Sequence, residues 1–341
     1  MRSLNHWSGR LIKVALIAAL VVGIVLVGIG RQTHVLAQDG PQTFVIQAGG
    51  FGPQNIELFK FSPTTLQVHR GDTVVWDIFS FHNIHFNDQP TDYVIFQEVN
   101  GENIPVANPA VALPTIENGA TYSGGDANSG LPDVTQSIQF SVVIDLEPGI
   151  YAYLCDVHPG MVGTIEVVAD DEPIPGPLDV SAQAFLEIQG AIGEGLGAAV
   201  ATDQNPPAGE GTEHFVQMGA AIGRASSQMF YPQTLTIPAG DTVTWTIPED
   251  SNDGHLANWP PTPPEGFVTV IEVEDGPPIL AIGEGLLPSG PSGFDVGADG
   301  VFNTGIMFPG QSFSAVFTEP GTYRYVCSIH PGMYGTIVVT E

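Results

Sequence analysis

The chain has 341 residues, with 37 acidic side chains against 8 basic ones, 41 glycines and 29 prolines. The length predicts two domains, and the glycine and proline content predicts short strands joined by turns rather than a helical bundle. After residue 37 the only basic residues are Lys60, Arg70, Arg224 and Arg324. This excludes nucleic acid as a partner, because phosphate binding needs clustered cations. Two cysteines are too few for a disulfide-stapled scaffold.

The N-terminal 37 residues combine a basic start with an apolar run, Val14–Gly30, and contain no acid. Small residues at Val35-Leu36-Ala37 suit a signal peptidase. The pattern predicts a signal peptide or membrane anchor in residues 1–37, with membrane attachment through residues 11–30 where the segment is kept. A buried core helix is the alternative interpretation. Export places the rest of the chain outside the cytoplasm, secreted or at the surface or in the periplasm.

Three sequence motifs occur twice in the same order. The pairs are Gly71–Trp76 with Gly240–Trp245, Glu147–Tyr151 with Glu319–Tyr323, and Cys155–Met161 with Cys327–Met333. Their separations of 169, 172 and 172 residues indicate a tandem duplication of one domain. The predicted organisation is one domain at 40–170, a linker at 171–213 rich in proline and glycine that can contain a helix, and a second domain at 214–341.

Each copy has the sequence pattern of β structure. Segments rich in β-branched and aromatic residues predict strands at 73–78, 137–144 and 150–155, and again at 242–247, 312–318 and 322–327. Tyr151 and Tyr323, each after a Glu-Pro-Gly turn, are placed like the corner tyrosine of a Greek-key sandwich. Asn100-Gly101 and Asp275-Gly276 predict type I′ hairpin turns.

The strongest chemical signal is a cysteine followed by His at +3 and Met at +6, in both copies. Thiolate, imidazole and thioether suit copper, and one Cys with two His and a weak axial Met forms a blue-copper electron-transfer site. The second histidine is His82 or His85 in the first copy. In the second copy it is His255, the only histidine between Trp245 and Cys327.

These motifs resemble those of the cupredoxins in the plastocyanin and azurin family. His82-Asn83-Ile84-His85-Phe86 is similar to the family's His-Asn-Val-His-Phe, whose first His is a ligand, and the short Cys-x2-His-x2-Met loop is amicyanin-like. The resemblance implies an all-β chain with two Greek-key β-sandwich domains in tandem. It also implies two type 1 copper ions, held by His82, Cys155, His158 and Met161 and by His255, Cys327, His330 and Met333.

The two copies depart from each other beside the ligands. Asn83 follows His82, and in the family this Asn supports the Cys loop by hydrogen bonding, but Leu256 follows His255. The spacing from the strand tryptophan to the histidine is 6 residues in one copy and 10 in the other. Unequal potentials or copper affinities are therefore expected.

Simpler interpretations exist for these residues. Cys155 and Cys327 could form a disulfide in an oxidising compartment, although they occupy equivalent positions in separate domains. His85 could ligate in place of His82, and its alternative role is structural. Met161 and Met333 could serve core packing alone.

The function expected from these residues is one-electron transfer by copper cycling between Cu(I) and Cu(II), not enzymatic turnover. The edge of His158 or His330 is the expected electron port, in an apolar surface patch. The acid excess favours cationic redox partners such as basic cytochromes, and membrane oxidoreductases are a further partner class. Copper storage or delivery is the alternative. A two-domain copper oxidase or nitrite reductase is less favoured, because no histidine adjoins either cysteine.

Overall fold

The structure is a computed structural model that describes residues 40–87, 89–132, 138–273 and 278–341. These residues belong to one compact unit, Gly40–Glu341. The predicted export segment, residues 1–37, lies outside the described residues. Among the helices of the described part of the chain, none is long and apolar enough to cross a membrane.

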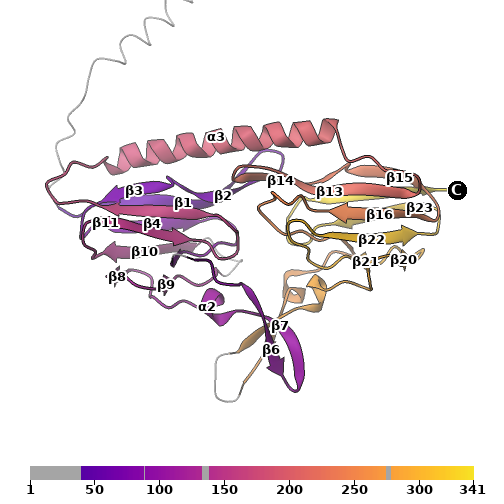
Figure 1. Cartoon of the computed structure of the whole chain (residues 1–341), viewed down its shortest axis with the longest axis horizontal. Coiled ribbons are helices and arrows are strands. Elements are labelled where there is room, and N and C mark those ends of the chain that lie inside the picture. The colour runs from indigo at the N-terminus through magenta and orange to yellow at the C-terminus, as the bar shows by residue number, and fades with distance from the viewer. Residues whose placement is uncertain (1–39, 88, 133–137, 274–277) are drawn as a thin grey trace, which may run out of the picture. The chain divides into compact units, whose positions relative to one another are not determined.

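The first domain is a two-layered β-sandwich (Figure 1). Its strands are β1 (Thr43–Gly52), β2 (Ile56–Ser62), β3 (Thr65–Val68), β4 (Thr73–Ile78), β5 (His85–Phe86), β8 (Ala120–Tyr122), β9 (Ala127–Asn128), β10 (Ile138–Ile144), β11 (Gly149–Leu154) and β12 (Val162–Val167). One layer has the strand order β2-β1-β4-β10-β8, and the other has the order β3-β12-β11-β5-β9. Neighbours that are not consecutive in the chain give the crossover connections of a Greek key.

The second domain repeats this arrangement. Its strands are β13 (Glu213–Ile222), β14 (Ala225–Tyr231), β15 (Thr234–Pro238), β16 (Asp241–Thr246), β17 (Asn258–Trp259), β20 (Phe294–Val296), β21 (Phe302–Asn303), β22 (Ser312–Phe317), β23 (Gly321–Val326) and β24 (Tyr334–Thr340). The layers have the orders β14-β13-β16-β22-β20 and β15-β24-β23-β17-β21. The predicted all-β fold of two tandem β-sandwiches is confirmed.

Buried aromatic side chains fill each sandwich beside its cysteine. Trp76 meets Tyr153 edge-on with ring centroids 5.3 Å apart, and Trp245 meets Tyr325 in the same way at 5.6 Å. Because side chains alternate along a strand, the tyrosine and the cysteine two residues later share the inward face. The corner tyrosines are also confirmed: Tyr151 donates to Glu147 O at 2.8 Å, and Tyr323 donates to Glu319 O at 2.7 Å.

The two sandwiches are joined edge to edge. Strands β2 and β14 pair antiparallel, which gives a ten-stranded sheet of order β20-β22-β16-β13-β14-β2-β1-β4-β10-β8. Counted outward from this central pair, the strands of the second domain appear in the same order as the equivalent strands of the first domain. The pairing is between equivalent edges, so the two domains are related by a local twofold axis at this junction.

Hairpins from both domains make a further sheet. They comprise β6 (Val94–Val99), β7 (Glu102–Ala107), β18 (Val268–Ile271) and β19 (Ile279–Ile282), in the order β18-β19-β7-β6. Asn100 and Gly101 have φ of 54° and 86°, which confirms the predicted I′ turn. The second predicted turn, Asp275-Gly276, lies outside the described residues.

Helices are few. The long helix α3 (Pro177–Gln204) occupies most of the segment predicted as a linker, and the short ones are α2 (Pro109–Ala112), η1 (Pro264–Gly266) and η2 (Glu284–Leu286). Pro177 suits the first turn of α3 because the first amides of a helix need no partner within it. Figure 1 shows α3 lying along both domains, and it contacts β1, β2, β13 and β14. Its Ile188, Ile192 and Leu196 pack on Ile56, Leu58 and Ala225 at the junction.

Candidate metal centres

Each cysteine lies just beyond the end of a strand, at the start of a short hydrogen-bonded loop. Cys155 follows β11; its N–H donates to Met161 O at 3.0 Å, and the Met161 N–H donates to His158 O at 3.0 Å. Cys327 follows β23 and makes the equivalent bond to Met333 O at 3.0 Å. These bonds fold the loop back on itself, so that the thiol and the following histidine face the same point.

In the first domain the structure brings together His82, Cys155 and His158. The Nδ1 atoms of the two histidines are 2.9 Å apart, and the Cys155 Sγ atom lies 3.7 Å from His82 Nδ1 and 3.6 Å from His158 Nδ1. All three residues are buried. Met161, in the same loop, is also buried.

The second domain forms the same group from His255, Cys327 and His330. The two Nδ1 atoms are 3.1 Å apart, and Cys327 Sγ lies 3.3 Å from His330 Nδ1. Met333 is buried in the loop. The different spacing between the strand tryptophan and the histidine therefore does not prevent the same three groups from meeting.

The first histidine of each group packs against the backbone of a glycine that the sequence motifs did not single out. Gly49 and Gly219 lie at β-bulges with φ of 77° and 76°. A Cβ atom there would lie 2.3 Å from His82 Nε2 or 2.9 Å from His255 Nε2, so only glycine lets the backbone approach the ring. Gln47 and Gln217 donate to the O atoms of these glycines at 2.9 Å. The repeated Gln-x-Gly, 170 residues apart, was the available signal.

The thiols are poised to act as thiolates. Burial raises the pKa of Cys155, but hydrogen bonds and charge from His158 and His82 outweigh it and lower this pKa to about 5. In the second domain burial opposes the charge of His330 and the hydrogen bonds of both histidines, and the pKa of Cys327 falls to about 6. Since the thiolate is the form that binds metals, both cysteines are ready ligands.

The residues present fit copper. An ion held at about 2.0 Å from two nitrogens and about 2.3 Å from a sulfur, in one plane, separates the nitrogens by about 3.5 Å and each nitrogen from the sulfur by about 3.7 Å. The sulfur–nitrogen distances of 3.7, 3.6 and 3.3 Å approach this, and the nitrogen–nitrogen distances of 2.9 and 3.1 Å are shorter, so the two rings would move slightly apart around an ion. The donors are one thiolate and two imidazoles, the trigonal set of blue-copper sites. Two His-Cys-His groups therefore fit two copper sites. Axial ligation by Met161 and Met333 stays a prediction.

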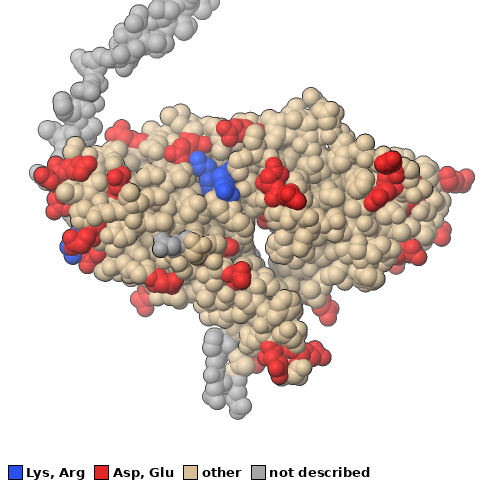
Figure 2. All heavy atoms as spheres, viewed as in Figure 1, with Lys and Arg blue, Asp and Glu red and all other residues tan. Residues whose placement is uncertain are grey.

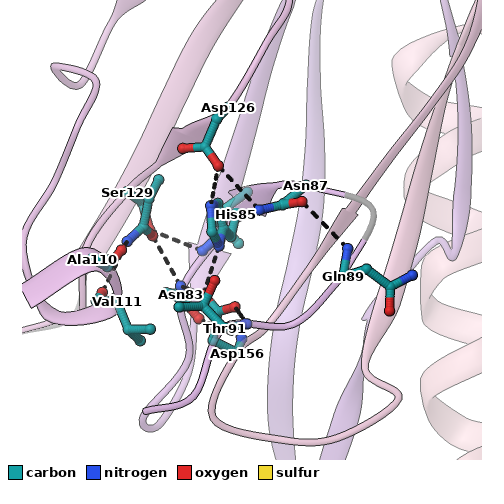
Figure 3. Close-up of polar contacts among 12 residues, drawn as sticks. Asn83, His85, Asn87, Gln89, Thr91, Ala110, Val111, Asp126, Ser129 and Asp156 are labelled. Atoms are coloured by element: carbon teal, nitrogen blue, oxygen red, sulfur yellow. Dashed lines mark hydrogen bonds and ion pairs between the residues drawn. The ribbon is translucent and has the colours of Figure 1, made fainter. Parts of the chain in front are cut away.

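His85 belongs to a polar network behind the first site (Figure 3). Its Nδ1 lies 2.8 Å from Asp156 Oδ2 and its Nε2 lies 3.2 Å from Asp126 Oδ2. Desolvation lowers the pKa of His85, but Asp156 and Asp126 outweigh it, so this pKa lies above its ordinary value. His85 is thus placed away from the Cys155 thiol, and the structural role considered for it fits this position.

Asn83 ties the same network to the cysteine loop. Its Oδ1 accepts from the Asp156 N–H at 2.9 Å, and its Nδ2 donates to Asp156 Oδ2 at 2.7 Å and to Asn128 Oδ1 at 2.9 Å. Asp156 Oδ1 also accepts from the Thr91 N–H at 2.7 Å. The loop support expected from the family resemblance is therefore present in the first domain.

The second domain replaces this network with neutral groups. The aliphatic side chain of Leu256, fully buried, stands where Asn83 stands. Asn258 and Ser328 take the positions of His85 and Asp156; Ser328 Oγ donates to Asn258 Oδ1 at 2.8 Å and accepts from the Thr262 N–H at 2.9 Å. The two metal groups share their donors but differ in what supports them.

The outer edges of His158 and His330 do not face solvent, so the prediction that one of them forms a surface electron port is wrong. Their relative exposures are only 4% and 9%. Both Nε2 atoms face Asp253, on a loop of the second domain. The port prediction failed because it treated each domain alone, whereas β2 and β14 join the domains at the edge beside the ligand loops.

The cysteines themselves are free and buried, so the alternative of a Cys155–Cys327 disulfide is wrong for this structure. Each thiol lies in its own domain beside two histidines. His69 and His214, which match no ligand position, lie elsewhere, with His69 Nε2 2.8 Å from Glu172 O and His214 Nε2 2.7 Å from Asp241 Oδ2.

A β-sandwich that gathers a buried thiolate and two imidazoles at one end is the architecture of a small copper protein. The family model of copper binding proteins of the plastocyanin/azurin type matches the chain twice, at residues 52–168 and 216–340. The chain belongs to this family, as a tandem cupredoxin.

Individual relatives match one domain or both. Plastocyanin of Scenedesmus fuscus is 32% identical over 126 residues, covering 36% of this chain and 96% of that protein. The structure of a purple cupredoxin from Nitrosopumilus maritimus is 25% identical, covering 37% of this chain and 98% of that one, with a TM-score of 0.22. A copper-containing nitrite reductase from Thermus scotoductus SA-01 is 19% identical, covering 89% and 69%, with a TM-score of 0.22.

Proposed function

We propose that the protein is an extracytoplasmic electron carrier with two mononuclear type 1 copper sites. The observation that carries the proposal is the pair of buried His-Cys-His groups, each with a thiol of lowered pKa. Membership of the plastocyanin/azurin family supports it. The metal ligands proposed are His82, Cys155, His158 and axial Met161, and His255, Cys327, His330 and axial Met333.

Bound copper supplies a one-electron Cu(I)/Cu(II) couple. The chain's part is to hold the donors in place and keep water out. Backbone bonds fix each Cys-to-Met loop, and the bulge glycines seat the opposing histidine against it. A donor set fixed in this way changes little when one electron is gained or lost. No reaction on a substrate is proposed, and the residues beside the cysteines, Leu154, Asp156, Val326 and Ser328, include no histidine that could lead to a catalytic metal.

The location and partners proposed follow from charge. The basic and apolar N-terminal segment supports export, and the residues after it carry four cations and 37 acids. Figure 2 shows scattered clusters of carboxylates on the visible face and very few cations. A surface of this sign steers cationic redox proteins, such as basic cytochromes.

Copper titration of the full chain, followed by visible and electron paramagnetic resonance spectra, tests the proposal. We expect two equivalents of tightly bound copper and an intense thiolate-to-copper band, matching the two donor groups. The variants Cys155→Ser and Cys327→Ser should each lose one equivalent and about half of the band, whereas His69→Gln should lose neither. Absence of the band in the wild type would refute blue-copper sites.

Reversible cycling separates electron transfer from copper delivery. Repeated reduction and reoxidation should leave the bound copper unchanged in the presence of a Cu(I) chelator. Loss of Cu(I) to the chelator on each reduction would instead identify a delivery protein. Copper-dependent turnover of nitrite or dioxygen would contradict the absence of enzymatic function.

A further inference from the structure

One carboxylate lies between the two metal groups. Asp253 Oδ2 is 2.6 Å from His330 Nε2 of its own domain, and Asp253 Oδ1 is 3.6 Å from His158 Nε2 of the other domain. The two oxygens of the same side chain thus face one histidine each. The Asp253 side chain is 14% exposed, and the two imidazoles are more buried still.

The orientation of the two rings makes this arrangement specific. The Nδ1 atom of His158 faces the Cys155 thiol, and the Nδ1 atom of His330 faces the Cys327 thiol. The opposite nitrogen of each ring, Nε2, therefore faces away from its metal group and toward Asp253. Imidazole, carboxylate and imidazole thus lie in line between the two donor groups, with the Asp253 carboxylate in close contact with His330 at 2.6 Å and facing His158 at the longer distance of 3.6 Å.

Contacts across the interface hold the first domain's ligand loop beside this line. Arg224, from the second domain, donates to Pro159 O in the first domain's loop at 2.7 Å and to Asn252 Oδ1 at 3.1 Å. The backbone atoms Phe59 N and Arg224 O are 2.9 Å apart, and Gln228 N and Asn55 O are 2.8 Å apart, beside the β2–β14 pairing. Phe59 also packs on the His158 ring with a centroid distance of 4.8 Å.

Asp253 has no counterpart in the first domain. It lies two residues before His255, and the residue two before His82 is Ser80. The line between the sites is therefore asymmetric, with a single carboxylate in a junction between equivalent strands. This position is unrelated to any copper-ligand motif, and its placement is a property of the two-domain molecule rather than of one cupredoxin.

We propose that Asp253 couples the two metal sites, so that they exchange one electron inside the molecule. The proposal rests on the proposed function. In the exchange one copper is oxidised from Cu(I) to Cu(II) while the other is reduced from Cu(II) to Cu(I). No bond in the protein forms or breaks, and Asp253 holds the facing Nε2–H groups in fixed positions. Asp253 is thus a positioning residue that acts through the two ligand histidines.

A metal site that includes Glu57 is the competing explanation for the position of Asp253. Its carboxylate is buried, accepts from Gln228 Nε2 at 3.2 Å and lies 4.0 Å from His330 Nε2. Glu57, Asp253 and His330 could therefore hold a third metal ion. In that case Asp253 would be a metal ligand, and a third equivalent of copper, lost in Asp253→Asn, would overturn the proposal.

The kinetic test uses the full copper-loaded chain. A pulse of reductant delivers far less than one electron per molecule, and the absorption then reports how the electron redistributes between the two sites. The separate spectrum of each site comes from the variants Cys155→Ser and Cys327→Ser. We expect a first-order phase whose rate does not depend on protein concentration. A rate proportional to concentration, or no redistribution between sites of unequal potential, would overturn internal exchange.

Matched variants assign the coupling to Asp253. Asp253→Asn should slow the first-order phase by at least about tenfold, which corresponds to roughly 1.4 kcal/mol in the barrier. Asp250→Asn, with the same charge change at an exposed position of the same loop, should leave the rate unchanged. Equal rates in Asp253→Asn and wild type, with both blue bands intact, would overturn the role of Asp253.

A spectroscopic measurement on the wild type needs no turnover and no folded variant. In the diamagnetic Cu(I) protein, imidazole ¹⁵N–¹H spectra should show both His158 and His330 with the proton on Nε2 and slow exchange with solvent. Rapid solvent exchange of either proton would overturn the bridge. If the chain took up no copper, the proposed function itself would fail, and the metal-free spectra would still report whether both rings face Asp253.

Discussion

The two domains hold the same donors but support them with different chemistry. In the first, Asp156 is buried among Asn83, His85 and the Thr91 N–H, so a charged network lies behind the cysteine loop. In the second, Leu256, Asn258 and Ser328 provide an apolar contact and neutral hydrogen bonds. The same loop geometry thus forms with either set of supporting side chains. The electrostatic field at the metal, in contrast, changes with the charge of those side chains.

The largest expected effect comes from removing the charged support. Asp156→Ser, the residue of the second domain, should lower the free energy of unfolding of the first domain by about 3 kcal/mol, because it leaves buried His85 without its main partner. Pairing it with His85→Asn should recover part of the loss, with a coupling energy of about 1–3 kcal/mol. Denaturant unfolding of the wild type, the two single variants and the double variant measures this coupling energy. Strictly additive losses would show that the network is not a unit.

Exchanging Asn83 for the leucine of the second domain is the next largest change. Asn83→Leu leaves the buried Asp156 N–H without a partner and removes one donor each from Asp156 Oδ2 and Asn128 Oδ1, at about 2 kcal/mol in total. Copper affinity of the first site should fall by about 10–100-fold because the loop loses its tie. Asn103→Leu, at an exposed position of β7, is the control and should cost under about 0.5 kcal/mol. Equal affinities in Asn83→Leu and wild type would separate Asn83 from the metal site.

The ligand-loop glycines should respond unequally. Gly160 has φ 77°, and a Cβ there would lie 2.1 Å from Arg224 Nη2; Gly332 has φ 88°, and its Cβ would lie 2.9 Å from Asn55 Nδ2. Alanine costs about 1 kcal/mol at either left-handed position. Gly160→Ala should cost about 1 kcal/mol more, because the Arg224 bond to Pro159 O is displaced. Thermal melts of the two variants test this, and equal melting temperatures would contradict the stabilising role of the Arg224 bond to Pro159 O.

Alkaline pH should remove the contribution of His85 to the stability of the first domain. The pKa of His85 is raised in the folded state, so its contribution is complete below the unfolded value of about 6.5 and is lost as pH rises through the higher folded value. Asn258 at the equivalent position does not titrate. The stability of wild type relative to His85→Asn should thus decline between neutral and alkaline pH. A constant difference over that range would contradict the assignment.

The smallest expected effect concerns the polar contact between α3 and the first domain. Glu187 accepts from Lys60 Nζ at 3.1 Å and from Thr64 N and Oγ1 at 3.2 Å, on the first domain only. Because the pair is partly exposed, Glu187→Gln should cost about 0.5 kcal/mol. Glu194→Gln, at an exposed position further along α3, should cost less. Chemical denaturation compares the two, and a larger loss for Glu194→Gln would reverse the assignment.

The cysteine and the following histidine of each metal group could be predicted from the sequence because their chemistry is local. Cys, His at +3 and Met at +6 occupy one loop, and the duplication showed which distant histidine to compare with which. The choice between His82 and His85 needed the fold, since both follow the same strand. Strand alternation alone does not decide which ring turns toward the cysteine and which toward Asp156 and Asp126.

The junction could not be predicted from either copy alone. The pairing of β2 with β14 depends on two edges that look like any others in sequence. Asp253 and Arg224 gain their roles only when those edges meet, and neither is part of a repeated motif. Long-range contacts of this kind leave no periodic pattern, which is why the outer edges of His158 and His330 were wrongly expected at the surface.

The mirrored strand order of the ten-stranded sheet has an evolutionary consequence. It is the arrangement of an isologous homodimer, in which every residue at the interface occurs twice. In such a dimer a carboxylate at the position of Asp253 would come with a second one at the position of Ser80. Once two protomers are fused into one polypeptide, each side of the interface can mutate alone. A single acid between two otherwise matching halves is a feature that fusion permits and that a homodimer cannot acquire.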